Sequence, residues 1–208
     1  MYHGNVIERR NRFLVSVKYN GRKIDTHLHD PGRLSELIYP GNDVIFREAS
    51  GKKTAFSITA AKKDGNWILT DSRFHNALIS SFFRNSWKSE VTLGKSRIDF
   101  FSSGYYVEIK GCSLEKDGIA MFPDAPSIRA SRQLADLTNW VLSGGKAALI
   151  VLVFSPVSKC FMPNATTDPL FSGRFKDAID AGVKCAALRF RTDEHGISFT
   201  GTIPIKAC

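Results

Sequence analysis

The segment that most constrains the fold is AALIVLVF, residues 147–154, a run of eight side chains that are all apolar. A membrane-spanning helix needs about 20 such residues, so this run predicts a buried strand instead. Residues 124–145 before it predict a helix, because apolar side chains recur on one face, Pro126 lies in the first turn and Gly144 ends it. Strand-like residues 96–114 come before that helix. A strand, a helix and a buried strand in this order are typical of a crossover between parallel strands in an α/β sheet.

Other segments extend this pattern. Residues 168–182 predict another helix, and residues 183–192 and 197–205 predict two closing strands. Residues 72–87 predict an earlier helix, with Ser72 as its cap. We therefore expect an α/β domain over residues 72–208.

The first third of the chain predicts a small barrel. Asn20-Gly21, Ser50-Gly51 and Asp64-Gly65 are turn signals between segments with strand character. Five short strands in about seventy residues favour a closed or curled sheet, and an OB-like barrel, which often binds nucleic acid, is one solution. The strands are expected at 12–20, 22–30, 42–50, 53–63 and 66–70. This N-terminal domain would span residues 1–71.

Composition points to a polyanionic partner and a reducing compartment. The chain has 29 Lys and Arg against 20 Asp and Glu, a net charge of +9, which favours nucleic acid or a membrane surface as partner. No apolar signal-peptide core opens the chain, and the four cysteines form no C-x-x-C pair, so we expect a cytoplasmic protein with reduced thiols. His27 and His29 would share a strand face, but without further ligands nearby they predict surface histidines rather than a zinc site.

Three charged residues stand out in the otherwise apolar segment SRIDFFSSGYYVEIKGCSL: Asp99, Glu108 and Lys110. Residues two apart on a strand share a face, so Glu108 and Lys110 point the same way. Asp99 joins them only if the intervening loop has an even number of residues or a bulge, which would place its Cβ atom roughly 5 Å from that of Glu108. The candidate site therefore depends on the turn.

Two neighbouring carboxylates among apolar side chains favour a divalent cation between them. Mg²⁺ or Mn²⁺ accepts one or two carboxylates and leaves other positions to water or phosphate. With the carbonyl of Ile109, Asp99 and Glu108 could hold such an ion, and Lys110 would stabilise charge during phosphodiester hydrolysis. The alternative is a structural ion pair of Lys110 with one acid. Asp124 follows this pattern in the wrong order to be its first acid and is expected to cap the next helix.

Several strings resemble motifs of the sugar fermentation stimulation protein (SfsA) family. They are GKSRIDFF, YVEIKGCSL, DGIAMFPDAPSIRASRQL, AGVKCAALRF and, nearer the N-terminus, HLHDPGRLSELIYPG. The resemblance covers nearly the whole chain. It implies an N-terminal OB-like domain, a C-terminal domain similar to PD-(D/E)-x-K nucleases, and DNA binding with little sequence preference.

The resemblance also assigns residues. The nuclease-like acids fall on Asp99 and Glu108 and the lysine on Lys110, while Glu90 matches an acid that precedes the hairpin and could be a further metal ligand. Candidate nucleic-acid contacts are Arg33, Arg12, Arg129 and Gln133, the last two on one helix face. The wider basic set, of which a minority should bind, is Arg9, Arg10, Arg12, Arg47, Lys52, Lys53, Lys62 and Lys63.

Three functional hypotheses follow from these residues. The first is a Mg²⁺- or Mn²⁺-dependent nuclease that acts on DNA. The second is a DNA-binding regulator, connected by its family name with sugar metabolism, in which the same fold grips DNA without cutting it. The third is an RNA-processing nuclease, which is compatible with the same residues.

Overall fold

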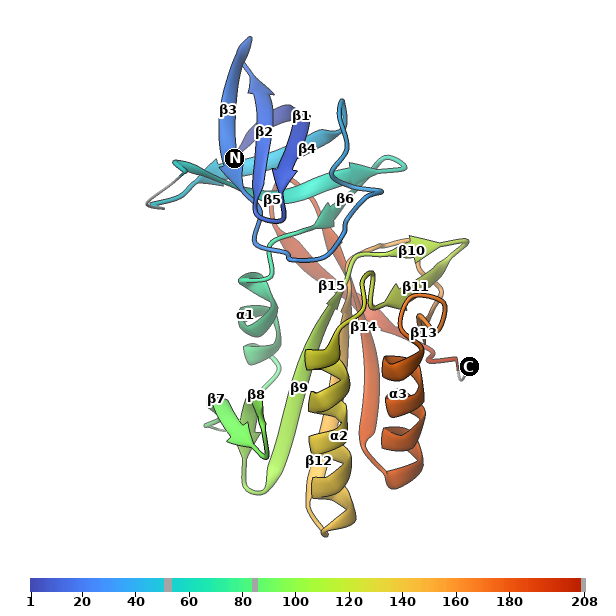
Figure 1. Cartoon of the computed structure of the whole chain (residues 1–208). Coiled ribbons are helices and arrows are strands. Elements are labelled where there is room, and N and C mark those ends of the chain that lie inside the picture. Colours follow the sequence, from blue (N-terminus) through green and yellow to red (C-terminus); the bar gives the residue numbers. More distant parts are fainter. Residues whose placement is uncertain (51–53, 84–85, 207–208) are drawn as a thin grey trace.

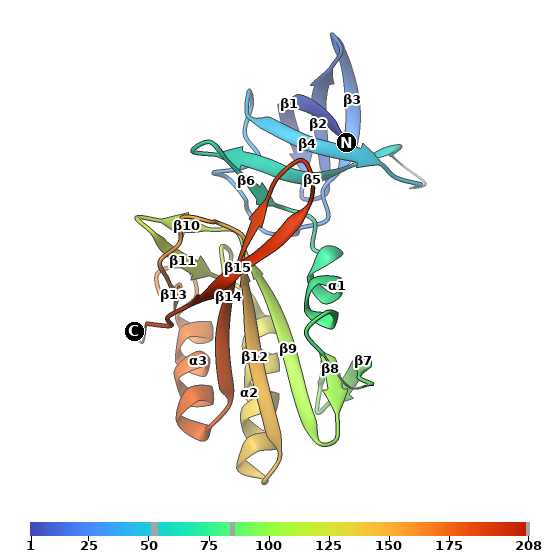
Figure 2. The same ribbon diagram turned by 180° about the vertical axis from the view of Figure 1, so that it is seen from behind.

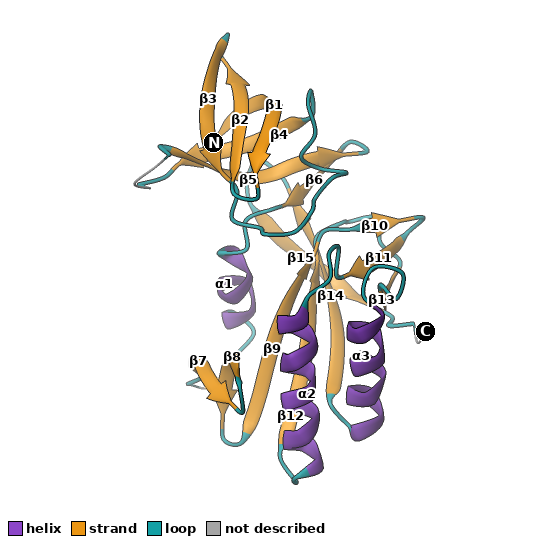
Figure 3. Cartoon of the chain, viewed as in Figure 1, coloured by secondary structure: helices purple, strands orange, loops and turns teal. Residues whose placement is uncertain are grey.

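The computed structural model describes residues 1–50, 54–83 and 86–206. A β-barrel built from the N-terminal third stands above an α/β unit (Figure 1), and the two parts meet along one side of the barrel (Figure 2). Colouring by secondary structure separates an all-strand upper part from a lower part in which long helices lie along a sheet (Figure 3). Within these residues, no helix is long and apolar enough to cross a membrane.

The N-terminal strands close into a barrel. They are β1 (Tyr2–Asn11), β2 (Leu14–Tyr19), β3 (Arg22–His27), β4 (Asp43–Glu48) and β5 (Phe56–Lys63). Their order is β3-β2-β1-β4-β5, and parallel pairing of β3 with β5 completes the circle. This arrangement confirms the predicted OB-like barrel.

The membership of the barrel differs from the prediction in one strand. The barrel includes β1, which the sequence did not predict, whereas β6 (Asn66–Leu69), predicted as the fifth strand, lies outside the closed circle. In β1 only Val6 is buried, and Gly4 lies where a Cβ atom would collide with Val17. Because β1 has a glycine and charged residues instead of alternating apolar ones, it carries no strand signal.

The rest of the main sheet follows β6 in the order β6-β14-β12-β9-β8-β7. The strands of this part are β7 (Lys88–Leu93), β8 (Ser96–Ser102), β9 (Tyr105–Cys112), β12 (Lys146–Val153), β14 (Lys184–Thr192) and β15 (Ile197–Ile203), which pairs with β14. The helices are α1 (Phe74–Ser80), α2 (Ile128–Leu142) and α3 (Pro169–Ala181). Strand β12 pairs in parallel with β9, which confirms the predicted crossover through α2. It also pairs in parallel with β14, so a second crossover runs through α3. A separate small sheet, not predicted, contains β10 (Glu115–Lys116), β11 (Ile119–Phe122) and β13 (Cys160–Pro163).

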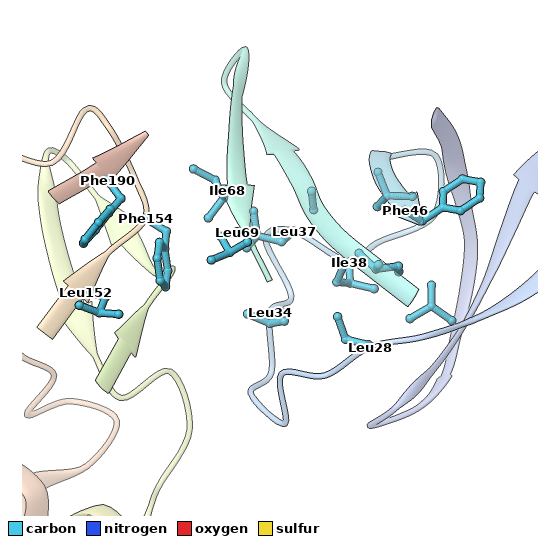
Figure 4. Packing of buried hydrophobic residues seen from close by; sticks show 14 of the residues in the cluster. Leu28, Leu34, Leu37, Ile38, Phe46, Ile68, Leu69, Leu152, Phe154 and Phe190 are labelled. Atoms are coloured by element: carbon cyan, nitrogen blue, oxygen red, sulfur yellow. The ribbon is translucent and has the colours of Figure 1, made fainter. Parts of the chain in front are cut away.

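The barrel and the α/β unit share one hydrophobic cluster (Figure 4). Ile68 and Leu69 of β6 lie between side chains of the barrel region and those of the sheet in this view. The labelled members are Leu28, Leu34, Leu37, Ile38, Phe46, Ile68, Leu69, Leu152, Phe154 and Phe190. Since burial of apolar surface is the main stabilising contribution, the two parts stabilise each other.

Two predicted helix starts need correction. Helix α2 begins at Ile128, after Pro126, and its cap is Ser127, whose Oγ accepts a hydrogen bond from the Ala130 amide at 3.2 Å. Asp124 therefore does not cap this helix; its carboxylate accepts a bond from the Leu34 amide of the barrel region at 3.2 Å.

Helix α1 is shorter than predicted and is not capped by Ser72. The Ser72 hydroxyl instead donates to the carbonyl of His29 at 2.8 Å, which ties the start of α1 to the barrel. The buried Asp71 carboxylate accepts a bond from the Arg73 amide at 3.2 Å. The predicted helix included residues 84–85, which lie outside the described residues.

Candidate functional site

The β8–β9 hairpin meets the condition for bringing the two acids together. Ser102 pairs with Tyr105 across a turn of two residues, Ser103 and Gly104, whose φ angles are 49° and 81°. Positive φ at both positions is the geometry of a tight hairpin turn. The loop is therefore even, and the same register, continued along the strands, places Asp99 opposite Glu108.

The side chains of the two acids replace part of the hydrogen-bond ladder. The backbone pairing of β8 with β9 extends to Phe100 and Val107. Beyond it, the Asp99 amide donates to Glu108 Oε2 at 3.3 Å, and the Ile109 amide donates to Asp99 Oδ2 at 2.7 Å. Both carboxylates thus lie where the strands separate, and backbone amides hold them in place.

Lys110 lies beside Glu108 and is held by α2. Its Nζ atom is 2.5 Å from Glu108 Oε1 and 2.7 Å from Gln133 Oε1. Gln133 is only 1% exposed, and its Nε2 donates to the carbonyl of Arg97 at 2.8 Å. The prediction that Gln133 meets nucleic acid on an exposed helix face is therefore wrong, because this side chain is buried and orients Lys110. The side chain of Arg129, by contrast, is exposed.

The electrostatics of the pair follow from burial. Burial raises the pKa of Glu108 to about 7, an effect that the charge of Lys110 reduces and the neighbouring Asp99 reinforces. Burial also raises the pKa of Asp99, and hydrogen bonds from Ile109 and Asn76 work in the opposite direction. A cation placed beside these two carboxylates would stabilise their charged forms and lower their pKa values.

Helix α1 contributes two residues that the sequence reasoning missed. The side chain of Asn76 hydrogen-bonds Asp99. The ring of His75 packs so closely on Gly111 that a Cβ atom there would collide with it, and burial lowers the pKa of His75 to about 4. No spacing rule connects residues 75–76 with β8 and β9, so no local sequence signal could have identified them.

Glu90 lies next to the pair but is engaged elsewhere. Its carboxylate is 3.0 Å from Arg97 Nε, and its backbone has a φ of 57°, unusual for a residue other than glycine. Its negative charge contributes to the raised pKa of Asp99. Over the described ranges, no group of three or more His, Cys, Asp or Glu side chains is arranged to hold a metal ion. Two carboxylates remain, a donor set that fits Mg²⁺ when water and phosphate complete the coordination.

A cleft of about 470 Å³ opens beside Lys110, between the barrel and the α/β unit. Arg12 from the barrel and Arg129 from the start of α2 line it together with Lys110 and Ile109. Arg33 is exposed on the neighbouring barrel loop and is not part of the lining. In the part of the chain that the structure describes, the guanidinium groups of these three arginines form no ion pair.

Much of the wider basic set is already engaged within the protein. Arg9 donates to the carbonyl of Gly32, and four other members pair with carboxylates. These pairs are Arg10–Asp25, Arg47–Asp71, Lys62–Asp43 and Lys63–Glu115. Lys52 and Lys53 lie outside the described residues. The cleft arginines are therefore the better candidates for an external anion.

Two family models match the chain in succession. The model described as "SfsA N-terminal OB domain" matches residues 7–70, and that described as "Sugar fermentation stimulation protein RE domain" matches residues 68–196. The chain belongs to the SfsA family. The second match contains Asp99, Glu108 and Lys110, and the first contains Arg12 and Arg33.

Curated SfsA relatives agree over almost the full length. The sugar fermentation stimulation protein homolog of Saccharolobus solfataricus is 47% identical over 99% of this chain and 85% of that protein. The homolog of Sulfurisphaera tokodaii is 46% identical over 99% of this chain and 90% of its own length. A solved structure, Pyrococcus furiosus SfsA in complex with Ca²⁺, superposes with a TM-score of 0.91 at 25% identity and covers 99% of this chain and 95% of that one.

Proposed function

We propose that this SfsA chain binds DNA with little sequence preference and hydrolyses phosphodiester bonds with Mg²⁺ or Mn²⁺. The observation that carries the proposal is a pair of carboxylates, the half-buried Asp99 and the buried Glu108, beside Lys110 at the edge of a cleft. Burial raises the pKa values of both acids, and perturbed carboxylates beside a cleft are typical of functional sites.

Each residue has a part in this proposal. Asp99, Glu108 and the carbonyl of Ile109 would hold the ion, which when bound activates a water molecule and offsets charge on the phosphate. Lys110 stabilises the negative charge that develops on the phosphate oxygens. Gln133 keeps the Lys110 ammonium in place, because its oxygen accepts one of the three available N–H bonds.

The solved relative supports the type of ion. The Pyrococcus furiosus protein was obtained in complex with Ca²⁺. Ca²⁺ and Mg²⁺ both take oxygen ligands, carboxylates foremost. A family member that binds a hard divalent cation is in keeping with a carboxylate site in this chain.

The cleft supports the nucleic-acid part of the proposal. Arg12 and Arg129 face the same space as Lys110, and their unpaired guanidinium groups suit phosphate oxygens. Contacts to phosphate position a nucleic acid without reading its sequence. We therefore expect similar affinity for unrelated sequences and a steep loss of affinity as salt increases.

A non-catalytic role is the second candidate, and one observation favours it. The Lys110 ammonium already lies 2.5 Å from Glu108, so the acid has a cationic partner without any metal. In that case the fold would bind DNA as a regulator, and the ion pair would be structural. An RNA substrate is equally compatible with the phosphate contacts.

The experiment that separates these functions is a cleavage panel. The wild type, Lys110→Ala and Asp99→Asn are incubated with linear, nicked, branched and single-stranded DNA and with structured RNA, in Mg²⁺ or Mn²⁺. Lys184→Ala, an exposed lysine at the start of β14, is the matched control. Products from the wild type and the control, absent from both site variants, would support the nuclease and identify its substrate. Binding without products across the panel would favour the regulator.

A further inference from the structure

Three ring side chains lie in contact with one another at the surface of the barrel. The Phe13 ring lies parallel to that of His27, with an interplanar angle of 5° and centroids 5.9 Å apart. The ring of His29 contacts that of His27 at an angle, with centroids 4.3 Å apart and an interplanar angle of 60°. Phe13 is 45% exposed, although a large apolar ring gains free energy when it is buried. We name Phe13, His27 and His29 the ring stack.

The ring stack occupies the side of an OB barrel that generally receives ligands. Phe13 lies in the turn between β1 and β2, and His27 ends β3 where β3 pairs with β5. In OB folds, the face of strands 2 and 3 and the loop between strands 1 and 2 are the usual binding surface. The position of the stack therefore suits an external ligand.

The ring stack is next in sequence to the lining of the cleft beside Lys110. Its two ends are next in sequence to residues that line the cleft, since Arg12 precedes Phe13 and Asp30 follows His29. The Ser72 hydroxyl, another lining group, holds the carbonyl of His29 at 2.8 Å. A chain molecule bound in the cleft would need only a short extension to reach the rings.

We infer that the ring stack is a base-stacking site for single-stranded DNA whose backbone runs into the cleft at Arg12 and Lys110. The inference rests on the proposed function and adds the strand state of its substrate. Aromatic platforms beside a basic groove bind single strands, because unpaired bases offer their faces for stacking. In a duplex these faces are covered by neighbouring bases, so the rings would discriminate against it.

Charge and ring chemistry favour this occupant over a neutral ligand. The chain carries a net charge of +9, and Arg12 and Arg129 in the adjoining cleft form no ion pair with any described residue. The pKa of His29 is lowered to about 4, chiefly by burial, so at neutral pH its ring is uncharged and available for stacking. An oligonucleotide supplies both the anions and the flat apolar faces that this surface accommodates.

The test compares two exposed aromatic residues. Tyr39 is 46% exposed, close to the 45% of Phe13, and no aromatic ring among the described residues stacks on it. Binding of fluorescent oligo(dT) and of a blunt duplex is measured without divalent metal for the wild type, Phe13→Ala and Tyr39→Ala. Base stacking is worth about 1–3 kcal/mol, so Phe13→Ala should weaken oligo(dT) binding by about 5- to 150-fold. Duplex affinity and the Tyr39→Ala variant should remain as in the wild type.

A second variant keeps the test independent of any effect on folding. Phe13→Trp should restore oligo(dT) affinity, and its added indole fluorescence should be quenched by oligo(dT). Equal losses for single strand and duplex in Phe13→Ala, or no loss at all, would overturn the ring-stack assignment while leaving the proposed function intact. Quenching by a neutral glucose oligosaccharide instead of oligo(dT) would overturn it as well. A wild type that binds neither DNA would overturn the proposed function itself.

Discussion

At the residue scale, the raised pKa of Glu108 makes the unfolding free energy depend on pH. It is 2% exposed and lies between Asp99 and Lys110. Its folded pKa of about 7 is above the ordinary value of 4.5, so the folded state holds a proton that the unfolded state releases. This contribution to the unfolding free energy is complete below about pH 4.5 and is lost as the pH rises through about 7. A bound cation would offset the loss.

We therefore expect Mg²⁺ to stabilise the wild type in a pH-dependent way. Metal ligands must be deprotonated to bind, so Mg²⁺ should raise the melting temperature clearly at pH 8 and little at pH 5. Glu108→Gln should show no Mg²⁺ shift at either pH, whereas Glu194→Gln, at an exposed carboxylate, should behave as the wild type. Thermal melts with and without Mg²⁺ measure this. A wild-type shift of the same size at both pH values would contradict the assignment of Glu108 as a ligand.

Gln133 is the second residue whose role can be isolated. Gln133→Leu removes the partners of the Lys110 ammonium and the Arg97 carbonyl, and leaving buried polar groups unpaired costs about 1–3 kcal/mol. We expect a lower unfolding free energy in urea, a lower cleavage rate and little change in DNA affinity. Arg132→Ala, an exposed position on the same helix, is the control. A variant that cleaves at the wild-type rate would show that Lys110 does not depend on Gln133.

At the scale of elements, the starts of α2 and α3 depend on one carboxylate. Asp168 caps α3 by accepting a bond from the Phe171 amide at 2.9 Å, and its other oxygen accepts one from the Ser127 amide at 2.8 Å. Ser127 in turn caps α2. The loops that precede the two helices are thereby joined, and α2 carries both Gln133 and the cleft residue Arg129.

Replacement of the two caps should have unequal effects. Ser127→Ala removes one capping bond, which is worth about 1 kcal/mol. Asp168→Ala removes two bonds from a buried carboxylate, so we expect a loss of about 2 kcal/mol or more. Urea denaturation of the two variants and the wild type gives these differences. Equal losses would show that the bond to Ser127 does not stabilise the fold.

At the scale of the whole molecule, the barrel and the α/β unit share their core. The cluster that includes Leu69 contains residues of both parts. Further polar contacts join them, including the ion pair of Lys63 with Glu115 at 3.0 Å. The walls of the cleft are therefore fixed relative to each other, because the barrel and the α/β unit pack directly against each other.

This shared core predicts one cooperative unfolding transition. Leu69→Ala should cost about 2–5 kcal/mol, the usual loss for a leucine removed from a core, and should lower the stability of both parts together. Trp67 lies in β6 beside the barrel and Trp140 in α2, and Trp87 is the third tryptophan. Double Trp→Phe variants that keep only Trp67 or only Trp140 therefore separate the two fluorescence signals. We expect coincident urea midpoints in both backgrounds. Separate midpoints would show that the parts unfold independently.

The sequence by itself determined the features that arise from local periodicity. The apolar run 147–154 and the striped helix before it specified the parallel crossover, because a strand buried on both faces leaves no polar positions. The sequence also placed Glu108 and Lys110 on one face of a strand, but it left open whether the loop before them has an even length. The structure decided this point, because the two-residue turn at Ser103-Gly104 sets the register that brings Asp99 opposite Glu108.

Only the tertiary structure decided the features that depend on which elements meet. Strand β1 has no apolar alternation and is recognisable only through its pairing with β2 and β4. Asp124 bonds to Leu34, and Gln133 turns inward to Lys110, through contacts between residues far apart in the chain. Helix periodicity places a residue on a face but does not say what that face meets. Packing of the barrel against the sheet supplies that information, and with it the cleft.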